Sequence, residues 1–133
     1  MQTQCNAIII TNSNTIIGEA AFKGCKELKT INLPAFTGVE IKKEAFRSTE
    51  ALEEVNNLKY VIKVGEYAFA ESNIRNAEIG INAKYEEGVF FQSKIEEVTI
   101  GEGANFGLGV FQSCLNLKTV EFKSYRAPKL EDS

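Results

Sequence analysis

The feature that most constrains the fold of this 133-residue chain is a pattern that recurs every 21 to 24 residues. Its clearest copy is Ile17 to Leu33, IGEAAFKGCKELKTINL. This copy holds a large apolar residue, a Gly, an Ala-Phe pair, a small residue three positions after Phe, and an apolar triplet spaced LxxIxL. The anchoring Phe recurs at positions 22, 46, 69, 90 and 111. A repeat of this length predicts a solenoid of stacked turns, because one unit cannot bury its apolar face alone.

The copies agree in phase, with a few departures. Lys42 and Glu86 stand where Gly is expected, and Val89 and Val110 replace the Ala next to Phe. The second copy carries Asn56-Asn57-Leu58 in place of a regular IxL. We expect that strand to depart in its local register and the fold to be unaffected. The position three residues after Phe holds only small side chains, namely Cys25, Thr49, Ser72, Ser93 and Cys114.

The stretch GEAAFKGCKELKTINLP resembles the BspA-type leucine-rich repeat, whose units read roughly IGxxAFxxCxxLxxIxLP. The resemblance runs over nearly the whole chain. With the period, it predicts an α/β leucine-rich-repeat solenoid of about five repeats of 21 to 24 residues. Short parallel strands would line the concave side, and turns or short helices carrying a stack of Phe side chains would form the other side.

Each LxxIxL triplet is expected to form a short strand, because alternate side chains of a strand point to opposite faces. The Phe side chains are expected to stack as the spine of the core. Small residues three positions after Phe would fill a narrow space, where Ser or Thr can hydrogen-bond to neighbouring backbone. Cys25 and Cys114 are then equivalents of Ser, and a packing role is favoured over a redox or metal role.

We predict a single solenoid domain over residues 1–133 that enters in mid-repeat. Cys5-x-x-Ile8-x-Ile10 fits the LxxIxL half of a turn whose Phe half is missing. A terminal repeat is usually polar on its outer face, and this one is apolar. The chain is therefore either part of a longer array or covered at this edge, and residues 5–10 are predicted to support edge-to-edge self-association. Residues 124–133, which contain Pro128, are predicted to form an irregular exit.

Composition excludes several classes of function. With 44% hydrophobic and 25% charged residues and a formal net charge of −3, the chain is not expected to bind nucleic acid, which favours a basic surface. No apolar run approaches the ~18 to 20 residues that span a bilayer, so no membrane insertion is expected. Residues 1–11 do not resemble a signal peptide. The residues leave the compartment open, while the resemblance implies a secreted or cell-surface protein.

No pattern in the sequence predicts an enzyme, a cofactor site or a metal site. The chain has no His and no CxxC, so a Cys or Ser nucleophile lacks its usual base. Cys25 and Cys114 are four turns apart, roughly 19 Å at the spacing of stacked strands, which is too far for a disulfide. Gly101-Glu102-Gly103 is not followed by the rest of a phosphate-binding loop.

The remaining candidate site is a surface. The residues that flank the middle apolar position of each strand should face the concave side, where solenoids commonly bind. They are Thr30, Asn32, Glu54, Asn56, Asn76, Glu78, Glu97, Thr99, Thr119 and Glu121. This polar, weakly acidic face suits a protein or glycan ligand, although a solvated sheet face without a ligand has the same composition.

Two functions follow from different classes. The first is a non-catalytic recognition or adhesion module at the cell surface, as the resemblance implies. The second is a structural spacer or targeting segment of a larger repeat or multidomain protein. An intracellular scaffold is a third interpretation, compatible with free cysteines.

Overall fold

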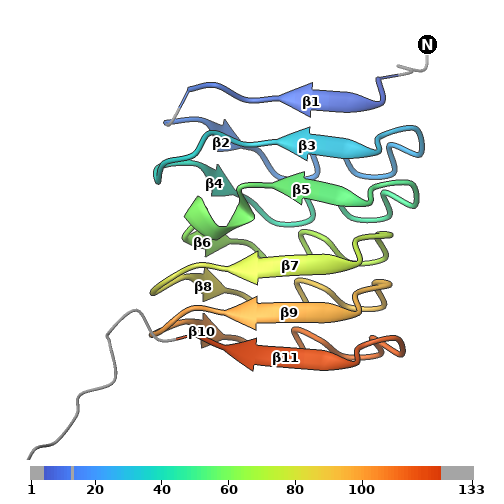
Figure 1. Cartoon of the computed structure of the whole chain (residues 1–133). Coiled ribbons are helices and arrows are strands. Elements are labelled where there is room, and N and C mark those ends of the chain that lie inside the picture. The colour runs from blue at the N-terminus through green and yellow to red at the C-terminus, as the bar shows by residue number, and fades with distance from the viewer. Residues whose placement is uncertain (1–4, 13, 124–133) are drawn as a thin grey trace, which may run out of the picture.

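The chain folds into a stack of similar turns (Figure 1), and the computed structural model describes residues 5–12 and 14–123. The front of the stack carries the longer strands, which are β1 (Ala7–Ile9), β3 (Thr30–Asn32), β5 (Glu54–Asn56), β7 (Asn76–Ile79), β9 (Glu97–Ile100) and β11 (Thr119–Phe122). The back carries two-residue strands, which are β2 (Ile16–Ile17), β4 (Glu40–Ile41), β6 (Lys63–Val64), β8 (Lys84–Tyr85) and β10 (Asn105–Phe106). One short 3₁₀ helix, η1 (Leu58–Tyr60), follows β5.

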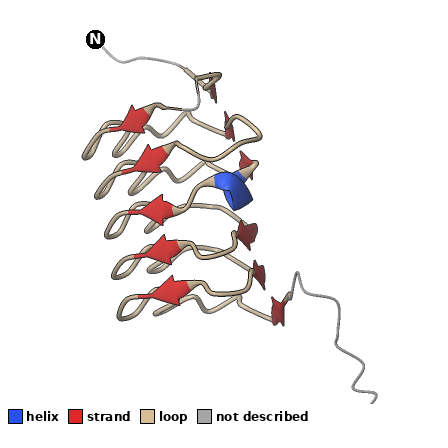
Figure 2. Ribbon diagram, turned by 90° about the vertical axis from the view of Figure 1, so that its left-hand side faces the viewer, coloured by secondary structure: helices blue, strands red, loops and turns tan. Residues whose placement is uncertain are grey.

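Neighbouring strands within each sheet are parallel. The back strands form one five-stranded sheet in the order β10-β8-β6-β4-β2. The front strands form two three-stranded sheets, β1-β3-β5 and β11-β9-β7. Figure 2 shows the front and back layers from the side. The predicted solenoid of about five turns of parallel strands is therefore confirmed.

Each Phe of the repeat lies at the centre of a turn in which the residues two before and two after it have positive φ. Around Phe46 these are Glu44 at 56° and Ser48 at 62°. The same two places in the other turns are held by Ala20 and Gly24, Tyr67 and Glu71, Gly88 and Gln92, and Gly109 and Ser113. Because a residue with a Cβ loses roughly 1 to 2 kcal/mol in this conformation, contacts between turns must stabilise it.

The positive φ values direct alternate N–H groups along the axis of the stack. In the turn around Phe46, the N–H groups of residues 44, 46 and 48 donate to carbonyls of the next turn at 2.8 Å. A helix would use these groups within its own segment. The α/β class with short helices is therefore not confirmed, since these segments are turns and η1 is the only helix in the described part of the chain.

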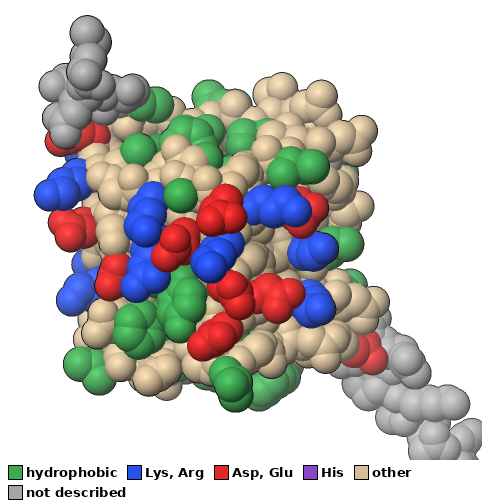
Figure 3. Space-filling model, turned by 180° about the vertical axis from the view of Figure 1, so that it is seen from behind, with side chains coloured by type: hydrophobic (Ala, Val, Ile, Leu, Met, Phe, Trp, Pro, Cys, Tyr) green, Lys and Arg blue, Asp and Glu red, His purple; other side chains and the backbone are tan. Residues whose placement is uncertain are grey.

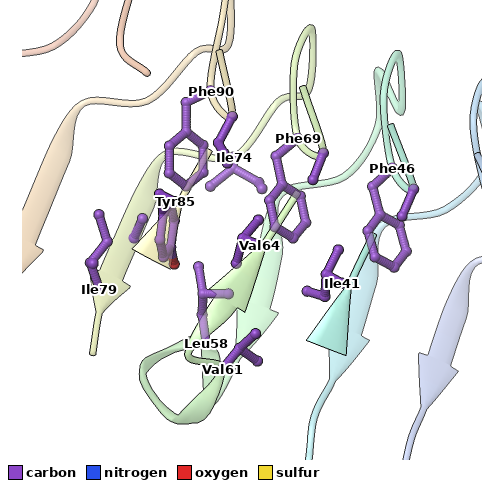
Figure 4. Packing of buried hydrophobic residues seen from close by; sticks show 14 of the residues in the cluster. Ile41, Phe46, Leu58, Val61, Val64, Phe69, Ile74, Ile79, Tyr85 and Phe90 are labelled. Atoms are coloured by element: carbon purple, nitrogen blue, oxygen red, sulfur yellow. The ribbon is translucent and has the colours of Figure 1, made fainter. Parts of the chain in front are cut away.

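The Phe side chains form a continuous stack, as predicted from the period. Ring centroids lie 5.3 Å apart from Phe22 to Phe46 and from Phe46 to Phe69, 5.9 Å from Phe69 to Phe90 and 5.7 Å from Phe90 to Phe111. Figure 4 shows Phe46, Phe69 and Phe90 beside the buried aliphatic residues of the neighbouring strands. Phe46, Phe69 and Phe90 are fully buried, so the stack is the centre of the core.

The small residues after Phe pack as the sequence indicated. Thr49 is buried, and its hydroxyl donates to the carbonyl of Phe46 at 2.6 Å. The thiol of Cys114 occupies the equivalent place in the last turn and donates to the carbonyl of Phe90 at 2.9 Å. Cys5, Cys25 and Cys114 are free thiols.

At the N-terminal end of the stack, β1 pairs with β3 and places Ile8 opposite Ile31. The single domain and its mid-repeat start stay predictions, and the predicted exit over residues 124–133 lies outside the described residues. Within residues 5–12 and 14–123, no helix is long and apolar enough to cross a bilayer.

Truncating the central ring of the stack tests the core. Phe69→Ala removes a fully buried side chain that packs between Phe46 and Phe90. We expect the free energy of unfolding to fall by about 3 to 5 kcal/mol in urea denaturation. Glu78→Lys, on the exposed front, should change it by less than about 0.5 kcal/mol. An unchanged unfolding midpoint in the Phe69 variant would refute the stacked core.

Tyr85 supplies a test in which a substitution is expected to raise the free energy of unfolding. It is fully buried in the back sheet, and its hydroxyl has no hydrogen-bond partner among the described residues. Burial raises the pKa of this phenol far above its ordinary value. Because an unsatisfied buried hydroxyl is destabilising, Tyr85→Phe should raise the free energy of unfolding by about 1 kcal/mol or more.

Tyr67→Phe is the matched control for that experiment. Its hydroxyl donates to Glu87 at 3.2 Å on the exposed side of a turn. Loss of this hydrogen bond should leave the stability unchanged or slightly lower. A loss of stability in Tyr85→Phe larger than that in Tyr67→Phe would show that the buried hydroxyl is satisfied in solution.

Candidate functional site

The parallel register brings the predicted surface residues together in rows across the front. One register line joins Thr30 to Glu54 and another joins Asn32 to Asn56. On the second front sheet the two lines are Asn76, Glu97 and Thr119, and Glu78, Thr99 and Glu121. All ten predicted residues are exposed or half-buried, while the residues between them on β3, β7 and β9 are buried. The structure thus places them on one polar face.

That face is interrupted between β5 and β7. Among the described residues the front ladder ends at β5 and starts again at β7, whereas the back strands β4, β6 and β8 remain paired. Figures 1 and 2 both show a gap here that is wider than the spacing of the paired front strands, and η1 lies at one end of it. We call this space the β5–β7 gap.

The interruption begins at Asn57, which follows β5 directly. Asn57 has a φ of 69° and leads the chain into η1 instead of prolonging the strand. Its side-chain amide donates to the carbonyl of Leu33 at 2.8 Å. Asn56 also bonds backwards, from its side-chain amide to that of Asn32. Both amides therefore hold β5 to the earlier turn and leave its other side open.

The β5–β7 gap contains a hollow of about 280 Å³. Val55, Leu58 and Ala77 contribute apolar atoms to its lining. The polar residues that line it are Glu53, Glu54, Asn56, Asn76, Glu78, Glu97 and Thr99. Four carboxylates therefore surround the hollow, and no Lys or Arg lines it. Such a site can bind through charge and hydrogen bonds.

The back of the molecule has a different charge arrangement. Figure 3 shows acidic and basic side chains interspersed there. Glu40 pairs with Lys42 at 3.0 Å and with Lys63 at 3.6 Å, and Glu86 pairs with Lys84 at 3.6 Å. By contrast, none of the four carboxylates of the hollow forms an ion pair with a described residue. The hollow on the front therefore carries carboxylates whose charge no ion pair within the described part of the chain neutralises.

The repeat is also recognised by comparison with known sequences. The family described as BspA type leucine rich repeat region matches residues 1–118 in 6 copies. This chain belongs to the BspA-type leucine-rich repeat family. No curated protein matches the sequence.

Solved structures of leucine-rich repeat proteins share this fold. A protein from Eubacterium ventriosum is 22% identical with a TM-score of 0.76, over 89% of this chain and 32% of its own. A leucine-rich cell surface protein from Faecalibacterium prausnitzii is 20% identical with a TM-score of 0.76, over 95% and 34%. One from Bacteroides ovatus is 21% identical with a TM-score of 0.67, over 90% and 38%. The chain thus spans about a third of the length of these relatives.

The BspA-type family and these structures are described as repeat proteins, and none of these descriptions names an enzymatic activity. Among the described residues, no group of three or more His, Cys, Asp or Glu is placed to hold a metal ion.

Sequence reasoning identified the polar front but missed η1 and the gap. The signal was present, since Asn56-Asn57-Leu58 departs from the LxxIxL pattern at the place where the ladder stops. Asn is one of the few residues with a Cβ that adopts positive φ readily, so Asn57 was a candidate for a chain reversal.

A charged network crosses the turns on the side away from the gap. Arg47 pairs with Glu44 at 2.8 Å and with Glu71 at 3.3 Å, and its guanidinium lies 4.9 Å from the ring centre of Tyr67. The Ser48 hydroxyl donates to Glu71 at 2.6 Å. This hydrogen bond is the main cause that lowers the pKa of Glu71 below its ordinary value of 4.5, and Arg47 adds to it against the effect of burial.

The lowered pKa predicts a pH-dependent contribution of Glu71. Because its pKa is lower in the folded state, ionised Glu71 stabilises the fold above about pH 4.5, and this is lost as the pH falls through the folded-state pKa. Glu71→Gln should cost about 0.2 to 1 kcal/mol at pH 7 and less in acid, measured by urea unfolding. Glu50→Gln is the control, because Glu50 is exposed and has no ion pair within the described residues. A Glu71→Gln deficit of equal size at both pH values would contradict the assignment.

Proposed function

We propose that this chain is a non-catalytic binding module whose front face holds a protein or glycan ligand in cell-surface recognition or adhesion. The observation that carries the proposal is the arrangement of the front. Its exposed Glu, Asn and Thr side chains stand in register beside a preformed hollow. Side chains with unused hydrogen-bonding capacity around a concave site are typical of ligand binding.

Two further facts support a recognition role. Repeat solenoids commonly bind through an extended surface, and the front is such a surface. The structurally similar protein from Faecalibacterium prausnitzii is described as a cell surface protein. Neither nucleic acid nor the interior of a membrane suits an acidic polar face, so a protein or glycan partner is proposed.

The alternative is a structural spacer or targeting segment of a larger protein. It is supported by the short span of this chain relative to the similar solved structures. The edge formed by residues 5–10 also supports it, since Ile9 is 71% exposed on β1. Self-association or continued stacking through this edge would cover that side chain.

Charge reversal on the front separates the two proposals. Binding of the wild-type protein to an array of glycans and immobilised secreted proteins is compared with that of Glu54→Lys/Glu78→Lys/Glu97→Lys. The control Glu19→Lys/Glu27→Lys/Glu50→Lys carries the same change of charge on exposed residues away from the front. Thermal unfolding verifies that both variants remain folded.

We expect ligands of the wild-type protein to be retained by the control and lost by the front variant. Equal retention by both variants would move the binding site away from the front. A wild-type protein that binds nothing on the array and associates with itself through residues 5–10 would favour the spacer.

A further inference from the structure

The backbone of β5 presents hydrogen-bonding groups to the β5–β7 gap. In a parallel sheet, the N–H and C=O groups of successive residues point alternately to the two neighbouring strands. The N–H of Glu54 donates to the carbonyl of Lys29 in the preceding turn, and the carbonyl of Asn56 accepts from Leu33. Glu54 and Asn56 therefore face β3, and the N–H and C=O of Val55 face the gap.

The backbone of β7 presents the complementary groups from the other side. The carbonyl of Arg75 accepts from Glu97, and the carbonyl of Ile79 accepts from Gly101. These alternate residues face β9. The N–H and C=O groups of Asn76 and Glu78 therefore face the gap, and no backbone hydrogen bond among the described residues joins β7 to β5.

Two strand edges thus face each other across a wedge that is closed at one end by η1, which packs against β7. On the back, β6 pairs with both β4 and β8, and in the core Phe46 stacks on Phe69 at 5.3 Å. The opening is confined to the front, where Figure 1 shows it clearly. An added strand needs roughly 4.8 Å on each side. It would pair with two edges at once, whereas addition to an ordinary sheet edge pairs with one.

The side chains around the gap define the chemistry of such a strand. Its residues that point outward would lie within the rows of the front, one between Glu54 and Asn76 and the next between Asn56 and Glu78. Lys or Arg at these positions would meet carboxylates that have no ion pair among the described residues. Its residues that point inward would meet Val55, Leu58 and Ala77, of which Leu58 and Ala77 are buried, so we expect small side chains at these positions.

We propose that the β5–β7 gap is a receptor site for an extended basic segment of a partner protein, which inserts as an additional strand between β5 and β7. The inference rests on the proposed function, since it assigns the ligand class of the front face. The carboxylates around the gap would select a basic segment, and hydrogen bonds to the edges of β5 and β7 would fix its orientation. The inserted strand would make the two front sheets one continuous sheet.

The first experiment measures binding of a fluorescently labelled eight-residue peptide of alternating Lys and Thr by anisotropy at low salt. Glu54→Lys/Glu78→Lys should weaken binding by about tenfold or more, because both residues flank the gap. The control Glu27→Lys/Glu50→Lys makes the same change of net charge at two exposed residues that do not line the hollow. It should weaken binding only about twofold, through long-range attraction.

The second experiment separates strand insertion from charge. The same peptide with every second amide N-methylated keeps its side chains and charge but loses half of its backbone donors. We expect it to bind at least about tenfold more weakly than the unmodified peptide. The amides of Val55, Asn76 and Glu78 should also become protected from hydrogen exchange when the unmodified peptide is bound.

Four outcomes would overturn the inference, and they leave the proposed function separable from it. If the wild-type protein binds the unmodified and the N-methylated peptide equally, and Glu54→Lys/Glu78→Lys binds neither, the binding site lies on the front but the peptide is not inserted as a strand. Equal weakening by both protein variants would reject the gap. Failure of the wild-type protein to bind the peptide would reject a basic strand, while ligands from the array would still test the front. Dimerisation abolished by Glu54→Lys/Glu78→Lys would assign the gap to a second copy.

Discussion

Each turn of this solenoid must bring its backbone groups into register with the next turn, and the rest of the structure depends on that constraint. On the back the two-residue strands meet it by parallel pairing, and around each Phe it is met by alternate N–H groups that donate along the axis. The Phe rings then fall into a stack because the turns that carry them repeat at hydrogen-bonding distance. Residues with positive φ, such as Glu44, are tolerated for the same reason, because hydrogen bonds between turns offset the conformational free energy that positive φ costs.

The candidate site lies where this constraint is relaxed. Asn57 turns the chain into η1 after β5, so the front loses its pairing while the back sheet and the Phe stack keep theirs. The gap is therefore formed in the absence of a ligand, because the turns around it are paired on the back and stacked in the core. Preorganisation lowers the entropy lost on binding. For the proposed basic segment, the acidic side chains on both sides of the gap would add selectivity for charge.

The period of Phe and the LxxIxL triplets were sufficient to predict the stack, the strands and the polar front, because both patterns report which side chains are buried. They were not sufficient to predict the turns. Glu44 and Tyr67 have no local preference for positive φ, and they adopt it because the neighbouring turns supply hydrogen bonds. The gap was indicated only by the departure of Asn56-Asn57-Leu58 from the LxxIxL pattern, because the alternation of Glu54 and Asn56 is the same whether or not β7 pairs with β5. Sequence patterns identify the residues of the polar front, whereas the shape of the gap depends on whether two neighbouring turns pair.

The turns around Phe also give the molecule a dipole along the axis of the stack. Their alternate N–H groups point from each turn to the one that follows it, and the carbonyls that accept them point back. Aligned peptide dipoles add, as they do in a helix, so this column has a partial positive end at the last turn and a partial negative end at the first. Two identical ends of the stack would therefore repel each other along this column, and unlike ends would attract.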